Sequence, residues 1–320
     1  MAARILVSDS LAEEGLEVLR QDAEVEIKTD LTPPQLVETV GQYDAIVVRS
    51  GTKVTAEVIE AGQRLRVIGR AGVGVDNIDV GKATERGIIV VNAPTPTVVA
   101  VAEHTMALLL AAARHIHRAD ASLREGKWLK KQLVGTTLAG KVLGVAGIGR
   151  IGTAVAQRAR AFEMEIIAYD PYLTREQIEG RGATPVASLE KLLEQSDFVT
   201  LHVTLTPETR GIIGTRELAM MKPTACLINC DRGEVVDEEA LLKALEEGRL
   251  VAAGLDCFCE EPATDNPLCC HERVVATPHI AASTVEAQRD MAQEIAWQVL
   301  IALRGNRPQH LVNPEVLTKV

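Results

Sequence analysis

Short apolar stretches rich in Val, Ile, Leu and Ala alternate with amphipathic stretches along almost the whole chain. Apolar runs of this length are typical of parallel strands buried on both faces, and the amphipathic stretches are typical of the helices that cover them. The pattern therefore predicts an α/β protein with two doubly wound parallel sheets. The predicted strands are Arg4–Val7, Ala45–Arg49, Val67–Gly69 and Ile88–Val91 in a first set, and Val142–Ala146, Ile166–Tyr169, Phe198–Val203, Cys226–Asn229, Ala253–Asp256 and Val274–Ala276 in a second.

Two longer helical patterns connect and follow these sets of strands. One covers Val98–Gly126 and is predicted as a single helix, and the other covers Thr284–Arg304 after the last strand. A length of 320 residues is also typical of two domains rather than one. If the terminal helix packs on the first sheet, the second domain is inserted into the first. We therefore expect one domain of residues 1–97 and 286–320 and another of residues 98–285.

The composition excludes several classes of partner. The formal net charge is −10 and aromatic residues are only 2%, whereas nucleic-acid binders present basic patches and aromatic stacking surfaces. The longest apolar stretch, Met106–Ala113, is far shorter than the roughly 20 residues that a membrane-spanning helix needs. The residues after Met1 lack the pattern of a signal peptide. We therefore expect a cytoplasmic protein without nucleic-acid or membrane partners.

The six cysteines all lie between Cys226 and Cys270. Such clustering within a large chain is typical of reduced thiols in a cytosolic enzyme rather than of a disulfide framework. The alternative is a zinc site formed by Cys257, Cys259 and the run Cys269-Cys270-His271, but this spacing matches no standard zinc finger. We expect buried thiols and no metal.

The strongest local motif is Gly147-Ile-Gly149-Arg-Ile-Gly152, which follows a predicted strand and opens a helical pattern at Thr153–Phe162. In a dinucleotide fingerprint the first glycine permits a tight turn, the second lets a pyrophosphate approach the backbone, and the third lets helix and strand pack closely. The N-terminus of the helix adds unpaired N–H groups that face the phosphates. Asp170 ends the next strand and can bind ribose hydroxyls, while it would repel a 2′-phosphate, which favours NAD over NADP. The alternative is a tight turn with a structural role only.

Three side chains that suit hydride-transfer chemistry follow consecutive strands of the second set. They are Arg232, Glu261 and His279, which we call the trio. Ligand sites in open parallel sheets lie outside the carboxyl ends of the strands, so the trio can converge on one crevice. A histidine exchanges a proton near neutral pH, a neighbouring carboxylate orients it, and an arginine can bind a substrate carboxylate in two places. Each residue alone is more often structural than catalytic, but their shared position favours the catalytic hypothesis.

A third group of candidates lies in the first set of strands. Arg49 ends one predicted strand, Arg70 directly follows the next, and the turn Gly72-Val73-Gly74 follows Arg70. Arginines and the backbone N–H groups of such a turn can bind an anion. The alternative is a pair of arginines in surface loops.

Together these motifs resemble the D-isomer-specific 2-hydroxyacid dehydrogenases over essentially the full chain, and most closely the branch that oxidises 3-phosphoglycerate. The resemblance implies a Rossmann NAD-binding domain inserted into a flavodoxin-like substrate-binding domain. It also implies NAD-dependent oxidation of 3-phosphoglycerate to 3-phosphohydroxypyruvate, the first step of L-serine biosynthesis, by a homodimer formed through the NAD-binding domain. The segments that carry the resemblance are Val48–Lys53, Gly69–Asn77, Gly126–Trp128, Gly147–Gly152, Asp231–Glu238, Glu260–Pro262 and Thr277–Thr284.

The resemblance further implies roles for individual residues. His279 would be the acid/base, paired with Glu261, and Arg232 would bind the carboxylate and carbonyl groups of the substrate. Two arginines would bind the substrate phosphate, and backbone amides of the following turn would hold its carboxylate. The implied substrate-binding residues are Arg49, Arg70, Val73 and Gly74, and the positions that match NAD contacts are Gly147, Gly149, Arg150, Ile151, Gly152, Asp170, Val203, Cys230, Asp231 and Asp256.

Three positions depart from the usual pattern of the family. Asp231 stands where alanine is common, Thr204 stands where proline is common, and the segment around Thr97 lacks the usual Asn and Ser. None of these changes affects the trio. Because the chain ends at Val320, soon after Val312-Asn313-Pro314, we expect no C-terminal regulatory domain of the serine-sensing kind. Two alternative functions remain: a glyoxylate or hydroxypyruvate reductase of the same family, and an NAD-sensing corepressor built on the same fold.

Overall fold

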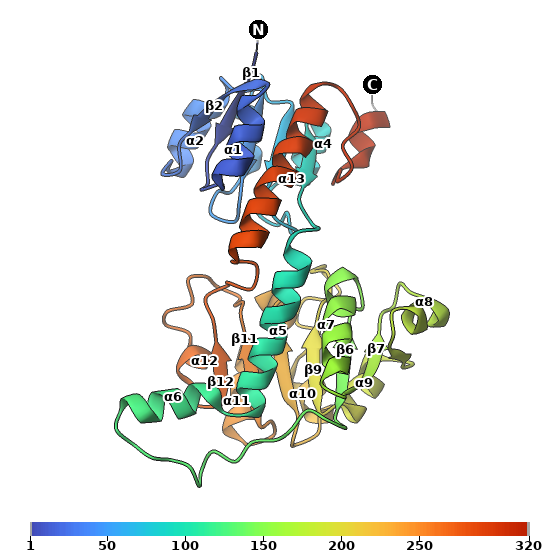
Figure 1. Ribbon diagram of the computed structural model, residues 1–320. Helices are drawn as coiled ribbons and strands as arrows, with labels where there is room; N and C mark the ends of the chain where they lie inside the picture. Colours follow the sequence, from blue (N-terminus) through green and yellow to red (C-terminus); the bar gives the residue numbers. More distant parts are fainter. Residues whose placement is uncertain (1, 319–320) are drawn as a thin grey trace. The chain divides into compact units, whose positions relative to one another are not determined.

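The computed structural model describes residues 2–318 and divides into two α/β units (Figure 1). The first unit comprises Met1–Thr97 and Ser283–Val320, and the second comprises Val98–Ala282. The chain therefore crosses from one unit to the other twice. The sequence pattern predicted that the first domain resumes at residue 286, whereas the first unit resumes at Ser283. The difference arises because the loop before the terminal helix Val285–Leu303 already belongs to the first unit.

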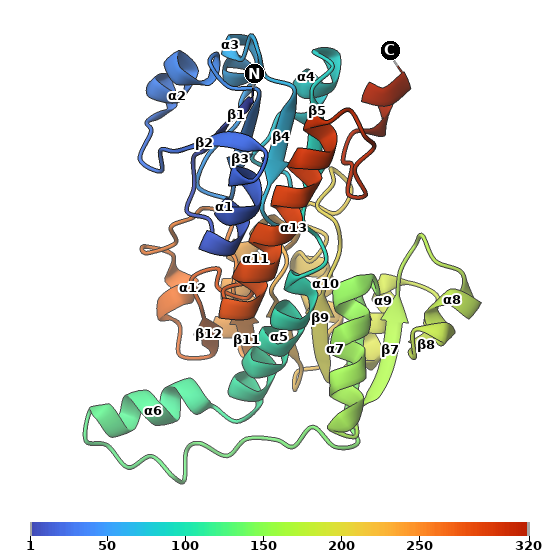
Figure 2. The same ribbon diagram turned by 45° about the horizontal axis from the view of Figure 1, so that its top comes forward.

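The first unit is built on a five-stranded parallel sheet. Its elements are β1 (Ala3–Val7), α1 (Glu13–Arg20), β2 (Ala23–Ile27), α2 (Pro33–Val40), β3 (Ala45–Val48), α3 (Ala56–Ala61), β4 (Val67–Arg70), α4 (Val80–Glu85), β5 (Ile89–Asn92), α13 (Val285–Leu303) and the 3-10 helix Pro314–Thr318. The strand order is β2-β1-β3-β4-β5. Helix α13 lies beside α1 in both views (Figures 1 and 2), and its residues Ile295 and Val299 are buried against Val47 and Val67 of the sheet. The terminal helix thus completes the core of the unit in which the chain began.

The second unit is built on a seven-stranded parallel sheet. Its elements are α5 (Thr97–Ala113), α6 (Ile116–Arg124), β6 (Val142–Ala146), α7 (Arg150–Ala161), β7 (Glu165–Tyr169), α8 (Arg175–Gly180), β8 (Thr184–Pro185), α9 (Leu189–Gln195), β9 (Phe198–Leu201), α10 (Thr215–Met220), β10 (Cys226–Asn229), the 3-10 helix Gly233–Val235, α11 (Glu238–Glu246), β11 (Ala252–Leu255), α12 (Pro267–Cys270) and β12 (Val274–Ala276). The strand order is β12-β11-β10-β9-β6-β7-β8, which changes direction at β6. Ligands of open parallel sheets bind at such a change of direction. The prediction of two parallel-sheet α/β domains is confirmed.

The sequence pattern did not predict two strands, β2 and β8, because both lie at sheet edges. Strand β2 reads Ala-Glu-Val-Glu-Ile, and its two glutamates leave no continuous apolar run. Strand β8 contains only two residues and also lies at an edge. A search for apolar runs finds strands that are buried on both faces, whereas an edge strand is partly exposed and needs fewer apolar residues.

The prediction of one helix over Val98–Gly126 is wrong. The segment forms α5 and α6, which are bent by 66° relative to each other, and His115 between them has the left-handed φ of 52°. The returning chain explains the break, because the N–H of Thr136 donates a hydrogen bond of 2.9 Å to the carbonyl of Ala113, the last residue of α5. The carbonyl of Ala113 is thus bound by Thr136, whereas in a continuous helix it would accept a hydrogen bond from a later residue of the same helix.

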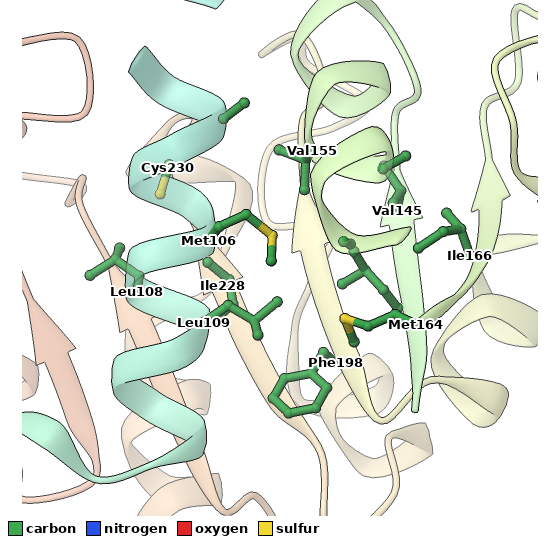
Figure 3. Close-up of a cluster of buried hydrophobic side chains, with 14 of the residues drawn as sticks. Met106, Leu108, Leu109, Val145, Val155, Met164, Ile166, Phe198, Ile228 and Cys230 are labelled. Atoms are coloured by element: carbon green, nitrogen blue, oxygen red, sulfur yellow. The ribbon is translucent and has the colours of Figure 1, made fainter. Parts of the chain in front are cut away.

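Helix α5 is buried against the second sheet. Figure 3 shows Met106, Leu108 and Leu109 of this helix in one core cluster with Ile228 and Phe198 of the strands. No single helix within residues 2–318 is long and apolar enough to cross a membrane, although the bent pair α5 and α6 reaches the required length and apolarity together.

Candidate active site

The turn after β6 has the backbone geometry that a pyrophosphate requires. Gly147 has a φ of 82°, and a Cβ at this position would lie 2.2 Å from the carbonyl oxygen of His202. A Cβ at Gly152 would lie 2.3 Å from the carbonyl oxygen of Gly147, so α7 packs tightly on the turn. A Cβ at Gly149 would meet nothing within 4 Å. The backbone at Gly149 is therefore open to a ligand, while Gly147 and Gly152 hold the turn in place.

The start of α7 and the end of β7 complete this site. Gly149 is the N-cap of α7 and provides no side-chain cap, so the first N–H groups of the helix have no capping oxygen there. The Asp170 carboxylate accepts hydrogen bonds from the N–H of Ile148 at 3.2 Å and of Tyr172 at 3.0 Å. The carboxylate thus lies beside the glycine turn, where the ribose hydroxyls of a dinucleotide would be. The donor set fits NAD: N–H groups and a helix N-terminus for the phosphates, and an acid for the ribose.

The side chain of Cys230 lies in the core of the second unit. Its thiol is buried in the core cluster behind α5 (Figure 3), and burial raises the pKa of the thiol to about 12. Of the other implied NAD contacts, Ile151 and Val203 are partly buried and pack against core residues of the second unit. Arg150 is exposed. A contact between Cys230 and a cofactor would therefore involve its backbone.

The loops that carry the trio leave three neighbouring parallel strands, β10, β11 and β12. Hydrogen bonds join their ends, since the N–H of Asp256 donates to the carbonyl of Asn229 at 2.9 Å and the N–H of His279 donates to the carbonyl of Asp256 at 2.8 Å. The carboxyl ends of the three strands are thereby tied together. This places the loops of the trio at one edge of the sheet.

Gly233 permits close contact between the loops of Arg232 and Glu261. A Cβ at Gly233 would lie 2.0 Å from the carbonyl carbon of Phe258, a distance that no side chain allows. The carbonyl of Arg232 accepts a hydrogen bond from the side-chain amide of Asn229 at 2.8 Å, and the N–H of Phe258 donates to the Glu261 carboxylate at 3.2 Å. Both loops are thus fixed by local hydrogen bonds where they meet.

His279 and Glu261 form a hydrogen-bonded pair. Nδ1 of His279 lies 2.9 Å and 3.0 Å from the two carboxylate oxygens of Glu261. The imidazole is 46% exposed, so a solvent-borne ligand can reach it. Donation from Nδ1–H to the carboxylate leaves Nε2 as the nitrogen that exchanges a proton. The pair therefore has the arrangement of an oriented acid/base.

The Arg49 and Arg70 loops of the first unit follow the neighbouring strands β3 and β4. The Asp9 carboxylate accepts hydrogen bonds from the N–H groups of Arg49 at 2.5 Å and Thr52 at 3.1 Å, which fixes the first loop. The carbonyl of Val73 accepts a hydrogen bond from the Asn92 side chain at 2.6 Å, which fixes the turn of Val73 and Gly74. Each loop is preorganised, as a binding site requires.

The prediction of buried thiols is only partly correct. Cys226, Cys230 and Cys257 are buried, whereas Cys259, in the loop after β11, and Cys270, at the end of α12, are exposed. Within residues 2–318, no group of three or more His, Cys, Asp or Glu side chains is placed to hold a metal ion.

His202, which follows β9, gives the second unit a pH-dependent stability. Burial lowers the pKa of its imidazole to about 4. The unfolded chain takes up this proton near the ordinary pKa of about 6.5, so the free energy of unfolding decreases as pH falls from there toward 4. Between about pH 7 and pH 5 we expect the free energy of unfolding of the wild type to decrease by roughly 2 kcal/mol more than that of His202→Gln. Urea unfolding at the two pH values measures this difference. Equal decreases in the free energy of unfolding of the two proteins would show that His202 is not the group responsible.

Sequence reasoning missed the side chains that hold the loop of His279. The buried Asp256 carboxylate accepts hydrogen bonds from the N–H groups of Ile280 at 2.9 Å and Ala281 at 2.8 Å, and His104 of α5 approaches the same carboxylate. Asp256 was implied only as an NAD contact. His104 carried a detectable signal, because it is one of few polar residues in an otherwise apolar helix.

Comparison with known proteins identifies the family of this chain. Residues 106–281 match the family model of the D-isomer specific 2-hydroxyacid dehydrogenase NAD binding domain. The chain is 52% identical to D-3-phosphoglycerate dehydrogenase of Methanocaldococcus jannaschii, with 97% of this chain and 59% of that protein aligned. It is 46% identical to D-3-phosphoglycerate dehydrogenase of Synechocystis sp., with 99% of this chain and 58% of that protein aligned. The chain thus spans about three-fifths of the length of these curated relatives.

Solved structures resemble the whole chain. The crystal structure of a glyoxylate reductase from Paecilomyes thermophila has a TM-score of 0.89 and 33% sequence identity, and the match covers 98% of this chain and 99% of the other. The family model covers the glycine turn, Asp170 and the trio, which are the features described above. The chain belongs to the D-isomer-specific 2-hydroxyacid dehydrogenase family.

Proposed function

We propose that this chain oxidises 3-phosphoglycerate to 3-phosphohydroxypyruvate with NAD, which is the first step of L-serine biosynthesis. The observation that carries the proposal is the pair of His279 and Glu261, held at the sheet edge that also carries Arg232. The two relatives compared above are both D-3-phosphoglycerate dehydrogenases, which supports the choice of substrate.

The proton of the 2-hydroxyl group goes to Nε2 of His279. As the O–H bond breaks, its electron pair forms the carbonyl, and the hydrogen on C2 leaves with the electrons of its bond. NAD, when bound at the glycine turn, supplies the acceptor for that hydride. The Glu261 carboxylate, 2.9 Å from Nδ1, stabilises the positive charge that develops on the imidazole. In the reverse direction His279 returns the proton to the alkoxide oxygen.

Arg232 holds the reacting end of the substrate. Its guanidinium can bind the substrate carboxylate in two places and polarise the neighbouring carbonyl. The side chain begins from a fixed backbone, because Asn229 binds the Arg232 carbonyl, and the Arg232 Nη1 group donates to the carbonyl of Asp231 at 2.7 Å. Backbone amides at Val73 and Gly74 provide the remaining carboxylate contacts in this proposal.

Arg49 and Arg70 bind the phosphate group of the substrate in this proposal. We expect Arg49→Ala or Arg70→Ala to raise KM for 3-phosphoglycerate about 10–100-fold, because each change removes a hydrogen bond between charged groups. Oxidation of unphosphorylated glycerate provides the control, and its KM should stay within about twofold because it lacks the phosphate. Steady-state kinetics with both substrates measure the effect. Equal changes for both substrates would show that the arginines do not recognise phosphate.

We also propose that the second unit forms a homodimer through α6 and the segment that follows it. This part of the unit extends away from the sheet (Figures 1 and 2), and it exposes the large apolar side chains of Ile116, Leu123, Trp128 and Val134. Exposed large apolar side chains are often covered by a partner at a protein interface. Sedimentation of the purified chain tests the proposal, and a monomer at micromolar concentration would contradict it.

The choice of substrate is tested by reduction rates with NADH. If the proposal is correct, 3-phosphohydroxypyruvate is reduced with a higher kcat/KM than hydroxypyruvate or glyoxylate. A preference for the unphosphorylated acids would instead identify a glyoxylate or hydroxypyruvate reductase. Repeating the assay with NADPH tests the role of Asp170, whose charge opposes a 2′-phosphate.

A further inference from the structure

His104 connects helix α5 to the loop that carries His279. Its Nε2 lies 3.0 Å from Oγ1 of Thr277 and 3.3 Å from the Asp256 carboxylate. The imidazole is only 19% exposed, and its helix is packed in the core of the second unit. The position of this side chain is therefore fixed by a rigid element.

Thr277 links His104 to Asp256 through hydrogen bonds. The Thr277 hydroxyl donates a hydrogen bond of 2.6 Å to Oδ1 of Asp256, so its own oxygen is free to accept Nε2–H from His104. The hydrogen bonds thus run in one direction, from His104 to Thr277 to Asp256. In a buried site such chains are mutually strengthening.

Asp256 holds the loop on both sides of His279. Its side chain is 1% exposed, and its carboxylate binds Thr277 before the histidine and the N–H groups of Ile280 and Ala281 after it. Burial alone would raise the pKa of this carboxyl, but hydrogen bonds from His104, Thr277 and the two amides outweigh it, so the pKa lies below its ordinary value. The loop is therefore anchored on an ionised carboxylate.

Such anchoring matters because the backbone of His279 is strained. Its φ of 52° lies in the left-handed region, which is unfavourable for a residue with a side chain. Strain of this kind persists only where surrounding contacts impose it. The hydrogen bonds before and after His279 impose the conformation that directs its imidazole toward Glu261.

We propose that His104 is a positioning residue for the acid/base, which acts through Thr277 and Asp256 to hold His279 in its working orientation. This inference rests on the proposed role of His279. His104 does not touch the substrate in this account, and its effect on the reaction passes entirely through the loop.

His104→Ala is expected to lower kcat for 3-phosphoglycerate oxidation about 10–100-fold, which is the usual effect of removing a residue that orients a catalytic group. The Kd of NAD should change by less than about threefold, because the glycine turn is untouched. His104→Gln retains an N–H donor and should restore most of kcat. Thr277→Val removes the relaying hydroxyl with little change in volume and should reproduce the loss. His117→Ala, which removes an imidazole outside this network, should leave kcat unchanged.

A double-mutant cycle separates positioning from general damage to the fold. In a His279→Ala background, adding His104→Ala should lower the residual rate by less than about twofold, because the group that His104 positions is already absent. The same fold-loss in both backgrounds would overturn the inference, and so would an unchanged kcat for both His104→Ala and Thr277→Val.

Hydrogen exchange of the unliganded chain provides a measurement that is independent of activity. In His104→Ala, amides in a peptide covering residues 277–283 should exchange faster, and those in a peptide covering 147–153 should not. Unchanged exchange at 277–283 would overturn the inference. If the wild type forms no NADH from 3-phosphoglycerate, the proposed substrate is wrong, and the exchange experiment still decides whether His104 holds the loop.

Discussion

Replacing His279 with alanine is expected to lower kcat for 3-phosphoglycerate oxidation about 10³-fold, because the proton of the hydroxyl group then has no positioned acceptor. The Kd of NAD should stay within about threefold of the wild-type value, since the glycine turn and Asp170 form a separate part of the site. Displacement of fluorescent bound NADH by NAD measures the Kd of NAD, and steady-state kinetics measure kcat.

Glu261→Gln provides the matched control for this change. It keeps the size of the side chain that faces Nδ1 of His279 but removes its charge. We expect an intermediate loss of about 10–100-fold, because the imidazole stays in place while its charged form is less stabilised. Equal losses of kcat and NAD binding in His279→Ala would show that the residue maintains structure and does not exchange the proton.

Replacing Arg232 with alanine is expected to lower kcat/KM for 3-phosphoglycerate about 10³-fold. Two contributions disappear together, since the guanidinium both orients the substrate carboxylate and stabilises charge on the carbonyl oxygen. Arg232→Lys keeps the positive charge and loses the two-pronged geometry, so it should recover only part of the loss.

Arg210→Ala is a suitable control for Arg232. Arg210 is an exposed arginine of the same unit whose nearest carboxylate, that of Glu234, is 3.9 Å away. Its removal should change kcat/KM by less than about twofold, because exposed ion pairs contribute little. Full activity of Arg232→Lys would contradict the proposed two-pronged contact.

The sequence pattern was most informative where burial was complete. Strands such as Ala45–Val48 and Cys226–Asn229 are buried at every position, and apolar side chains are then required on both faces. The edge strand Ala23–Ile27 was missed because two of its five residues are glutamates, which interrupt the apolar run. The break at His115 was also missed, because the contact that ends α5 comes from Thr136, a residue distant in sequence.

In the candidate site, too, some features were predictable from the sequence and others were not. The ends of β10, β11 and β12 could be expected to share one edge, because parallel strands place their carboxyl ends together. The contacts that fix this edge were not predictable. The approach of Gly233 to Phe258 and the reach of His104 to Thr277 depend on which loops are neighbours in space, and local patterns do not carry that information.

The central claim is that the chain transfers the hydrogen on C2 of 3-phosphoglycerate directly to NAD while His279 removes the hydroxyl proton. The most direct measurement uses 3-phosphoglycerate deuterated at C2, with NADH detected by its absorbance and its deuterium content determined by mass spectrometry. The account expects the unaltered chain to form NADH that carries the deuterium, and His279→Ala to form almost none. NADH without deuterium, or no NADH at all from this substrate, would contradict it.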